Sequence, residues 1–372
     1  MKVVILHPPL YPMNHKFFNE LGKHIDLVVY SFGNYPGYHA TWKVKDYISP
    51  SNNYSLKVLE GNTDLKRLAV SYKLQLNPSF LKYLHKEYPQ IVISVAFWVP
   101  SLYVAVFKHF YKCKLLILTD AISVTESQIS TFKKLLRFFI SRRADAFVSG
   151  SDLTTQYLQT ITKGKAIFKS TQTIDSVSWS KDLKTLESKS HLRKALGLPM
   201  SKKIVLTVGH LIPLKNNDKI IDSIKDLDNV HLVIVGEGYL RETLEEKIKI
   251  EQLEQRVTLL KRKEGTALKA YFKASDIFVF ASARDTFGYV VLEALASGLP
   301  VVCSKFSGAS SLIDDGYNGF VINPEQSFTK EILAAIEQLE TLANNALQSS
   351  ENFTIERKVE GFVEILKQVV ND

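Results

Sequence analysis

The sequence predicts an α/β protein of two doubly wound domains, each a parallel β-sheet with helices on both faces. Short apolar segments rich in β-branched and aromatic residues alternate with segments of helical periodicity through both halves of the chain. A polar stretch without clean periodicity, residues 170–190, separates the two halves and is interpreted as a linker. The length of 372 residues suits two domains of this kind.

In the first half, strands and helices are expected to alternate from the N-terminus. Strands are expected at residues 3–6, 27–31, 91–95, 115–118, 146–149 and 166–168. Helices are expected at residues 14–21, 77–87, 101–110 and 130–142, and from residue 152. The aromatic, turn-rich segment 32–54 is interpreted as an irregular excursion near the carboxyl ends of the strands, where such sheets bind ligands. The first domain is therefore expected to span residues 1–175.

The second half repeats the same alternation. Strands are expected at residues 203–208, 231–235, 256–260, 276–280, 301–302 and 320–322. Helices are expected at residues 217–225, 240–253, 266–274, 328–345 and 356–370, with a further helix from Phe287 to the stop at Ser297–Pro300. The second domain is therefore expected to span residues 190–350.

Composition limits the class of protein without naming its ligand. The chain is 45% hydrophobic and 23% charged, with a formal net charge of +9, which favours an anionic partner. A nucleotide-sugar, a diphosphate lipid, an anionic membrane and nucleic acid all satisfy that charge. Nucleic acid is the least favoured, because no recognised reading module and no basic stripe with stacking aromatics is found.

Cysteine content and the N-terminus indicate a cytoplasmic setting. Cys113 and Cys303 are the only cysteines, too few for a disulfide framework or a thiolate metal site. The four apolar residues that follow Lys2 are too short for a signal-peptide core. Residues 91–107 carry no charge over about 17 residues, the minimum spanning length. Pro100 in the middle of this segment favours a buried strand followed by a buried helix.

The segment 276–302 is the most informative in the chain. It reads as strand, loop, helix and strand, with Asp285 just before the helix and Glu293 about two turns inside it. The first-turn amides of such a helix carry partial positive charge, and Gly288 would let a ligand approach that backbone. This pattern suits a polyol joined to a phosphate. A surface Asp that caps a helix with an exposed Glu gives the same spacing.

This segment resembles the donor-site signature of the retaining nucleotide-sugar glycosyltransferases of family 4, also called group 1. In that signature two Glu residues flank seven others around a Phe-Gly pair; here Asp285 replaces the first Glu, while Phe287, Gly288 and Glu293 match. The similarity extends to residues 205–216, 232–244 and 307–324, and it is poor in the first half of the chain. It implies the GT-B fold, in which two Rossmann-like domains face a cleft. In that fold the last helix, here 353–372, usually returns to the first domain.

The resemblance also implies roles for individual residues. Lys215 matches a lysine that clamps the donor diphosphate, whereas His210 stands where the family has an arginine, after Gly209. Glu293 would accept hydrogen bonds from the ribose. Asp285, with the backbone at Phe287 and Gly288, would hold the transferred sugar.

Other positions match the family less well. Gly236 belongs to a Gly-x-Gly turn, and Lys261 follows the strand whose end holds the nucleotide base. Ser311 replaces an acidic residue of the family, and the expected glycine pair after the first strand is missing. In the acceptor half, Asp120 stands where the family often has a histidine and could orient an acceptor hydroxyl. His7 and His15 could approach the same place, or all three could have structural partners.

A basic segment within residues 130–143 allows two interpretations. Five apolar residues form a helical stripe: Phe132, Leu135, Leu136, Phe139 and Ile140. Lysines and arginines are interleaved with them. Such a helix can lie on an anionic bilayer or guide a lipid diphosphate acceptor. Apolar stripes of this kind more often face the core, with the charges on a solvated side.

These observations predict a retaining glycosyltransferase that moves a hexose-type sugar from a nucleoside diphosphate sugar to a glycan or lipid-linked acceptor. The expected setting is surface polysaccharide or glycoconjugate biosynthesis, in the cytoplasm or peripherally on the inner face of the membrane. No metal or other cofactor is expected, because no cluster of ligands has metal-binding spacing. Two alternatives stay open: a catalytically silent homologue acting as a scaffold, and a nucleotide-sugar epimerase of the same fold.

Overall fold

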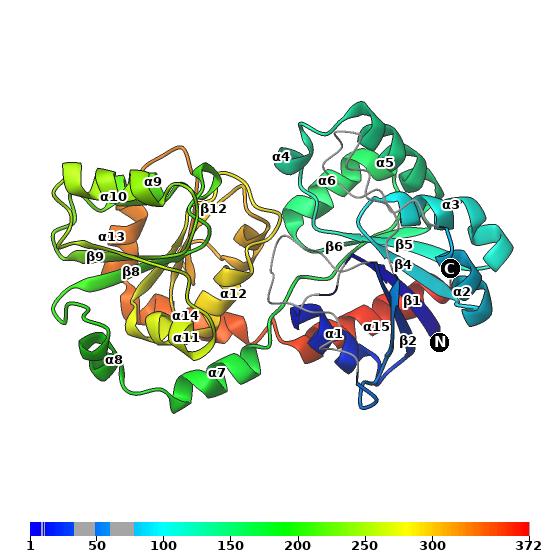
Figure 1. The fold of residues 1–372 in the computed structure, drawn as a ribbon, viewed down its shortest axis with the longest axis horizontal. Coiled ribbons are helices and arrows are strands. Elements are labelled where there is room, and N and C mark those ends of the chain that lie inside the picture. Colours follow the sequence, from blue (N-terminus) through cyan, green and yellow to red (C-terminus); the bar gives the residue numbers. More distant parts are fainter. Residues whose placement is uncertain (9, 11, 33–48, 60–77, 372) are drawn as a thin grey trace. The chain divides into compact units, whose positions relative to one another are not determined.

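The computed structural model describes residues 1–8, 10, 12–32, 49–59 and 78–371. The chain divides into two compact units, one formed by Met1–Thr171 with Ile355–Asp372 and the other by Gln172–Thr354. Each unit contains one wholly parallel sheet (Figure 1). The predicted α/β class with two doubly wound sheets is confirmed. Most of the segment 32–54, expected to be irregular, lies outside the described residues.

The first unit has a seven-stranded sheet in the order β3-β2-β1-β4-β5-β6-β7. Its strands are β1 (Lys2–His7), β2 (Asp26–Phe32), β3 (Ser55–Leu59), β4 (Ile91–Val95), β5 (Lys114–Thr119), β6 (Ala146–Ser149) and β7 (Ile167–Lys169). Its helices are α1 (Pro12–Leu21), α2 (Phe80–Glu87), α3 (Val99–Tyr111), α4 (Ser123–Glu126), α5 (Thr131–Arg143), α6 (Asp152–Thr162) and α15 (Ile355–Asn371). The edge strand β3 was not predicted.

Successive side chains of β1 point to opposite faces of the sheet, and helices cover both faces. Val3 and Ile5 face a core that includes side chains of α1 and α15, such as Phe17 and Phe362, whose rings meet edge to face at 5.5 Å. Val4 and Leu6 face the opposite core, formed with α2, α3, α5 and α6. The final helix α15 therefore completes the first unit, where it lies beside α1 (Figure 1).

The second unit has a six-stranded sheet in the order β10-β9-β8-β11-β12-β13. Its strands are β8 (Lys203–Val208), β9 (Val230–Val235), β10 (Val257–Leu260), β11 (Ile277–Phe280), β12 (Val301–Ser304) and β13 (Gly319–Ile322). Its helices are α7 (Ser176–Thr185), α8 (Lys189–Ala195), α9 (Asn217–Ser223), α10 (Arg241–Ile250), α11 (Gly265–Ala274), α12 (Tyr289–Ala296), α13 (Thr329–Glu337) and α14 (Leu339–Ser350). Two short 3-10 helices, Pro213–Lys215 and Gly308–Leu312, follow β8 and β12.

In each sheet an aspartate that precedes one strand hydrogen-bonds to the backbone of the neighbouring strand. Asp145 precedes β6 and accepts a hydrogen bond from the backbone N–H of Leu115, the second residue of β5, at 2.7 Å. Asp276 precedes β11 and accepts one from the N–H of Ile204 at 2.6 Å. Each carboxylate also pairs with a buried cation, Lys108 in the first unit and Arg193 in the second. Both sheets are thus fixed at their amino ends by charge-assisted hydrogen bonds.

Two expectations about the elements are wrong. Residues 170–190 are not an irregular linker, because α7 fills much of this stretch and packs on α11 and α12, with Trp179 Nε1 donating to Ser297 Oγ at 2.8 Å. The expected helix 328–345 is two helices, α13 and α14, that meet at Gln338. The helix α7 was not predicted because its residues are mostly polar. The break between α13 and α14 was not predicted because the helical periodicity continues through it.

Residues 91–107 form β4 and the start of α3, as the proline at position 100 predicted. Within the described residues, no helix is long and apolar enough to cross a bilayer.

The apolar stripe of α5 does not all face the core. Leu136 and Ile140 are buried, as the core interpretation predicted. Phe132, Leu135 and Phe139 are exposed, by 58%, 63% and 36%. The core interpretation is therefore wrong for these three residues, because the stripe is wider than the face that packs on the unit.

Candidate functional site

The predicted donor residues lie along the carboxyl edge of the second sheet. The chain runs outward from β8 through β9 to β10 and then returns to β11 on the other side of β8. This reversal creates a switch point between β8 and β11, the position at which open α/β sheets bind ligands. Gly209 and His210 follow β8, Gly236 follows β9, Lys261 follows β10, and Asp285 lies in the loop after β11.

Lys215 and Asp285 meet at the switch point. Lys215 Nζ forms an ion pair with Asp285 Oδ2 and lies 5.1 Å from the centre of the Phe280 ring. The other carboxylate oxygen of Asp285 accepts a hydrogen bond from the N–H of Phe287 at 3.2 Å. Both side chains are only about one-fifth exposed, so the pair is partly shielded from water. The sequence had assigned these residues to neighbouring groups of one ligand, and the fold places them in contact.

Gly288 fixes the start of α12. Its φ of 99° lies in the left-handed region, and an added Cβ would lie 2.7 Å from Cε1 of Phe280. The loop before it is held by the neighbouring loop after β12, since Ser307 Oγ donates to the carbonyl oxygen of Phe287 at 2.6 Å. The N–H of Ala309 donates to the same oxygen at 2.7 Å. The first-turn amides of α12 therefore have a fixed position at the edge of the sheet.

Glu293, in the second turn of α12, has a perturbed carboxyl group. Burial raises the pKa of Glu293 to about 7, and the nearby Lys269 acts in the opposite direction. Across the described ranges, no donor hydrogen-bonds to this carboxylate. A shielded carboxylate with unused acceptor capacity is suited to bind vicinal hydroxyls.

The glycines after β9 allow this loop to touch the loop after β8. A Cβ on Gly236 would lie 1.8 Å from the carbonyl oxygen of Gly209, and one on Gly238 would lie 2.2 Å from that of Leu211. The N–H of Leu211 donates to the carbonyl oxygen of Glu237 at 2.9 Å, which joins the same loops. These glycines are therefore required by backbone packing, whatever ligand the edge binds.

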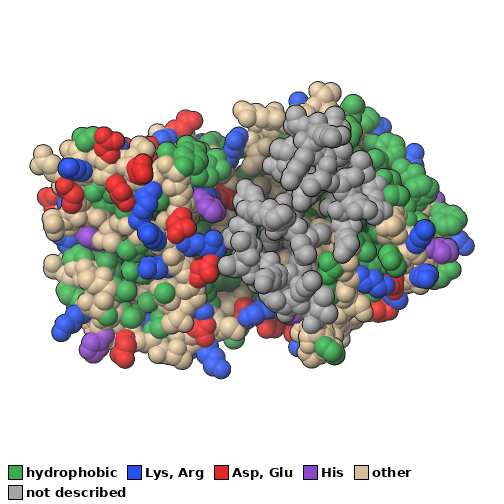
Figure 2. All heavy atoms as spheres, in the orientation of Figure 1, with side chains coloured by type: hydrophobic (Ala, Val, Ile, Leu, Met, Phe, Trp, Pro, Cys, Tyr) green, Lys and Arg blue, Asp and Glu red, His purple; other side chains and the backbone are tan. Residues whose placement is uncertain are grey.

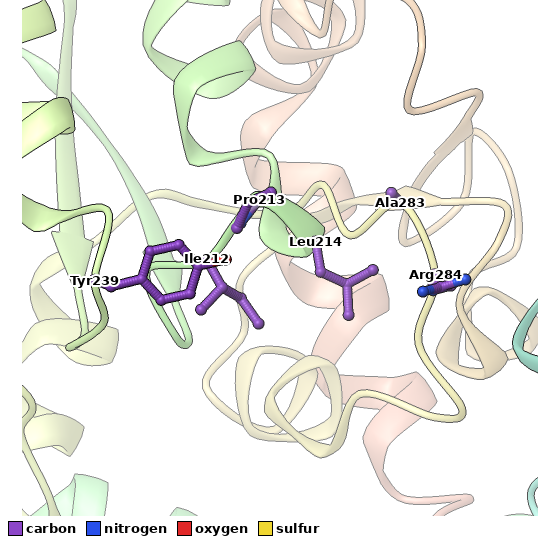
Figure 3. A pocket seen from close by; sticks show the side chains of 6 residues that line it. All are labelled: Ile212, Pro213, Leu214, Tyr239, Ala283 and Arg284. Atoms are coloured by element: carbon purple, nitrogen blue, oxygen red, sulfur yellow. The ribbon is translucent and has the colours of Figure 1, made fainter.

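An open pocket of about 560 Å³ lies at this edge of the sheet (Figure 3). Its lining includes Leu214 and Arg284, the residues that precede Lys215 and Asp285 in the sequence. It is lined by Ile212, Pro213, Leu214, Tyr239, Ala283 and Arg284. Arg284 was not predicted as a site residue. Among the described residues, no carboxylate lies within 4.0 Å of its guanidinium. Its position next to Asp285 in the sequence was the available signal. It adds a cation to the lining of this pocket.

Some predicted residues do not join this group of side chains. His210 and Lys261 are exposed, and Glu293 does not line the pocket. Ser311 Oγ donates to the carbonyl oxygen of Gly308 at 2.8 Å, within the short helix after β12. The acidic residue expected at position 311 from the family is thus replaced by a hydroxyl that satisfies the local backbone.

Asp120 belongs to the first unit, at the carboxyl end of β5. The negative charge of Asp120 acts on Lys358 of α15. The ammonium group of Lys358 lies 4.9 Å from the centre of the Phe17 ring. Burial lowers the pKa of Lys358 to about 8, and the Asp120 carboxylate opposes that shift. Asp120 therefore lies beside a cation that the sequence had not connected with it.

The two histidines near this edge have structural contacts. His7 is buried, its Nδ1 lies 2.5 Å from the carbonyl oxygen of Pro8, and burial lowers its pKa to about 4. His15 Nδ1 lies 2.8 Å from the hydroxyl of Tyr54. In the described part of the chain, no group of three or more His, Cys, Asp or Glu side chains could hold a metal ion.

Comparison with known proteins bears on the family of the second unit and on the fold. Residues 188–353, most of the second unit, match the family model of the glycosyl transferases group 1. A crystal structure of Anabaena HepE in complex with UDP aligns over 99% of this chain and 100% of that one, with a TM-score of 0.77 and 20% identity. Sucrose-phosphate synthase from Thermosynechococcus elongatus aligns over 99% of each chain, with a TM-score of 0.76 and 17% identity.

The chain thus has the GT-B fold. Its second unit is a group 1 glycosyltransferase domain, and the resemblance found in the sequence is confirmed.

Curated relatives match less than half of this chain. An uncharacterized glycosyltransferase of Methanocaldococcus jannaschii is 32% identical over 151 residues, covering 40% of this chain and 39% of the relative. A D-inositol 3-phosphate glycosyltransferase of Mycobacterium tuberculosis is 31% identical over 141 residues, covering 35% of this chain and 28% of the relative. The matched region spans less than half the length of these relatives.

Proposed function

We propose that this protein is a glycosyltransferase that transfers a hexose-type sugar from a nucleoside diphosphate sugar. The observation that carries the proposal is the group of side chains at the β8–β11 switch point. There Lys215 and Asp285 meet beside the first turn of α12, within a group 1 glycosyltransferase domain.

The donor is proposed to bind along the carboxyl edge of the second sheet. Lys215 and Arg284 would neutralise the diphosphate, where negative charge grows as the sugar departs. The amides at the start of α12 would add donors to the same group. Glu293 would accept hydrogen bonds from the ribose hydroxyls. UDP and UDP-glucose are the ligands named for the Anabaena structures, so a uridine nucleotide is the first donor to test.

Asp285 is proposed to have two states. In the described structure its carboxylate binds Lys215 and the Phe287 amide. A donor diphosphate that draws Lys215 toward its oxygens would release one carboxylate oxygen to accept a sugar hydroxyl. Because Asp is one methylene shorter than the family's Glu, the hydroxyl that it reaches would differ, and with it the preferred sugar.

The acceptor is proposed to be a glycan or a lipid-linked precursor at the inner face of the cell membrane. Asp120, at the carboxyl end of β5, would orient the attacking hydroxyl. Attack on the face that the diphosphate leaves would retain the anomeric configuration. The charges of Lys215 and Arg284 replace a metal in this scheme.

A silent scaffold protein is the rival with a specific observation behind it. Asp285 already has a partner on each oxygen, and the acidic residue expected at position 311 is absent. The rival predicts that the protein binds no sugar donor or binds it without turnover. An epimerase would instead change the donor without any acceptor.

Donor binding is the first test. Thermal unfolding of the purified protein would be measured with UDP, GDP and ADP and with their glucose derivatives. We expect stabilisation by one nucleotide series, and we expect Glu293→Gln to remove it. Glu254→Gln changes an exposed glutamate of the same unit and should keep the shift. No shift with any nucleotide would refute the proposed donor site and favour the scaffold.

A further inference from the structure

The outer face of α5 is apolar and basic at the same time. Phe132, Leu135, Phe138 and Phe139 are exposed by 58%, 63%, 54% and 36%. The helix contains five lysines and arginines and no acidic residue. Large exposed apolar patches on a soluble domain mark a surface that meets a partner or a membrane. The face therefore requires an occupant that accepts both aromatic side chains and positive charge.

The basic groups of this face lie among its rings. Arg142 lies 4.2 Å from the centre of the Phe138 ring, and Arg143 lies 5.1 Å from that of Phe139. Arg137, by contrast, points inward, where it pairs with Glu126 and donates to the hydroxyl of Tyr157 at 2.9 Å. In the part of the chain that the structure describes, no carboxylate pairs with Arg142 or Arg143. Their charges are available to an external anion.

The adjacent helix α3 extends the apolar surface. It packs against α5 and exposes Val106, Phe107 and Phe110 by 45%, 43% and 69%. Figure 2 shows hydrophobic side chains along this side of the first unit, with Lys and Arg side chains among them. These exposed residues of α3 and α5, with the cations of α5, are called the α3–α5 surface.

The charge of the whole chain is concentrated in the unit that carries this surface. Residues 1–171 and 355–372 contain 25 Lys and Arg against 14 Asp and Glu. Residues 172–354 contain 22 against 24. The net charge of +9 therefore comes from the first unit, which has +11, while the second has −2. The first unit alone would be drawn toward an anionic surface.

We propose that the α3–α5 surface docks the protein on an anionic phospholipid bilayer, with the aromatic side chains entering the interface and the cations binding lipid phosphates. Aromatic and leucine side chains flanked by Lys and Arg are the composition of interfacial helices. An anionic bilayer fits better than a single protein partner, because it offers counter-charge to the whole first unit, whose net charge is +11. This proposal deepens the proposed function, on which it rests for the lipid-linked acceptor.

Vesicle binding tests the proposal. Sedimentation would compare vesicles of phosphatidylcholine alone with vesicles that contain phosphatidylglycerol. We expect binding to the anionic vesicles that weakens with salt. Lys134→Gln, Arg142→Gln and Arg143→Gln together should weaken binding about 100-fold, at about fivefold for each cation. The matched control changes three exposed lysines of the second unit, Lys194, Lys249 and Lys330, to Gln and should bind like the original protein.

A second variant separates apolar insertion from charge. Phe132→Ser, Leu135→Ser and Phe138→Ser should weaken vesicle binding by about tenfold or more, because less apolar area enters the interface. Met200→Ser, Ile250→Ser and Leu333→Ser change exposed residues of the second unit and should have no effect. All six positions are exposed, so thermal unfolding should confirm that both variants fold.

The outcomes distinguish docking from the proposed function. A protein that is stabilised by a nucleotide but does not bind anionic vesicles would overturn the docking proposal alone. The docking proposal would also be wrong if the lysine substitutions of the second unit weakened binding as much as the substitutions on α5 do. The total charge of the protein, and not the position of the charges on α5, would then explain binding. Vesicle binding without any nucleotide effect would support docking and refute the donor site.

Discussion

The two units are both built on a parallel sheet, but they differ in net charge and in the residues at their edges and surfaces. Each has a parallel sheet with an aspartate at the amino ends of two strands, the partly exposed Asp145 in the first and the buried Asp276 in the second. The second unit is close to neutral and gathers glycines and a Lys–Asp pair at its carboxyl edge. The first unit is strongly basic and exposes aromatic side chains on α5. The two proposals therefore place ligand chemistry on the second unit and membrane attachment on the first.

The largest expected effect tests the shared framework. Asp276→Ala leaves the Arg193 guanidinium buried without its partner and should lower the free energy of unfolding of the second unit by about 3 to 5 kcal/mol. Asp145→Ala should lower that of the first unit by about 1 to 3 kcal/mol, because this carboxylate is more exposed. Hydrogen exchange, followed on individual peptides by mass spectrometry, would measure the stability of each unit separately. A larger effect of Asp145→Ala would contradict the comparison of burial.

The next effect concerns the close packing of the donor edge. Gly288→Ala adds a Cβ against the Phe280 ring at a left-handed φ, and should cost about 2 to 4 kcal/mol of stability. Gly316→Ala is the control, with a φ of 78° and no atom within 4 Å of the added Cβ. It should cost about 1 kcal/mol, from backbone strain alone. Urea unfolding measures both, and equal losses would show that the Phe280 contact is unimportant.

Loss of the Lys215 ammonium group should affect activity more than stability. Lys215→Met should lower kcat/KM about 100- to 1000-fold, as expected when a fixed donor to developing charge is lost. Arg284→Met should lower it less, since this guanidinium lies at the open pocket. Lys249→Met changes an exposed lysine on α10 and should leave kcat/KM unchanged. The proposed assignment would be wrong if Arg284 mattered and Lys215 did not.

The smallest effect is the pH dependence of donor affinity. Because burial raises the pKa of Glu293 to about 7, its carboxylate form becomes dominant only above that pH. If the carboxylate form binds the ribose, the affinity for UDP-glucose should rise about tenfold from pH 6 to pH 8. UDP-glucose itself has no ionisation in this range. Calorimetry on a His210→Gln background, with and without Glu293→Gln, should show the dependence only when Glu293 is present.

The same carboxyl group has an opposite effect on stability. A raised pKa means that the folded state binds the proton more tightly than the unfolded state does. This contribution to stability is present below pH 4.5 and is lost as the pH rises to about 7. Glu293→Gln should therefore flatten the dependence of the free energy of unfolding over this range. An unchanged slope would mean that Glu293 is not buried as a carboxyl group.

Local patterns predicted the strands of the second unit well, because most residues of its central strands are buried. The strand β8 has the predicted bounds, and the glycine and proline after α12 end it as expected. The helix α7 was missed because its residues are mostly polar, and its stability comes from contacts of Trp179 with another helix. The pairing of β3 with β2 depends on a distant segment and left no local pattern.

The sequence by itself determined the α/β class, the family of the second unit and the residues at its carboxyl edge, since these follow from short-range periodicity and from motifs within single loops. Only the tertiary structure decided which of these residues touch. Lys215 and Asp285 are 70 residues apart and form an ion pair because the chain reverses direction between β8 and β11. The raised pKa of Glu293 and the exposure of Phe132 and Leu135 were also decided there, because the neighbours of a side chain come from distant parts of the chain.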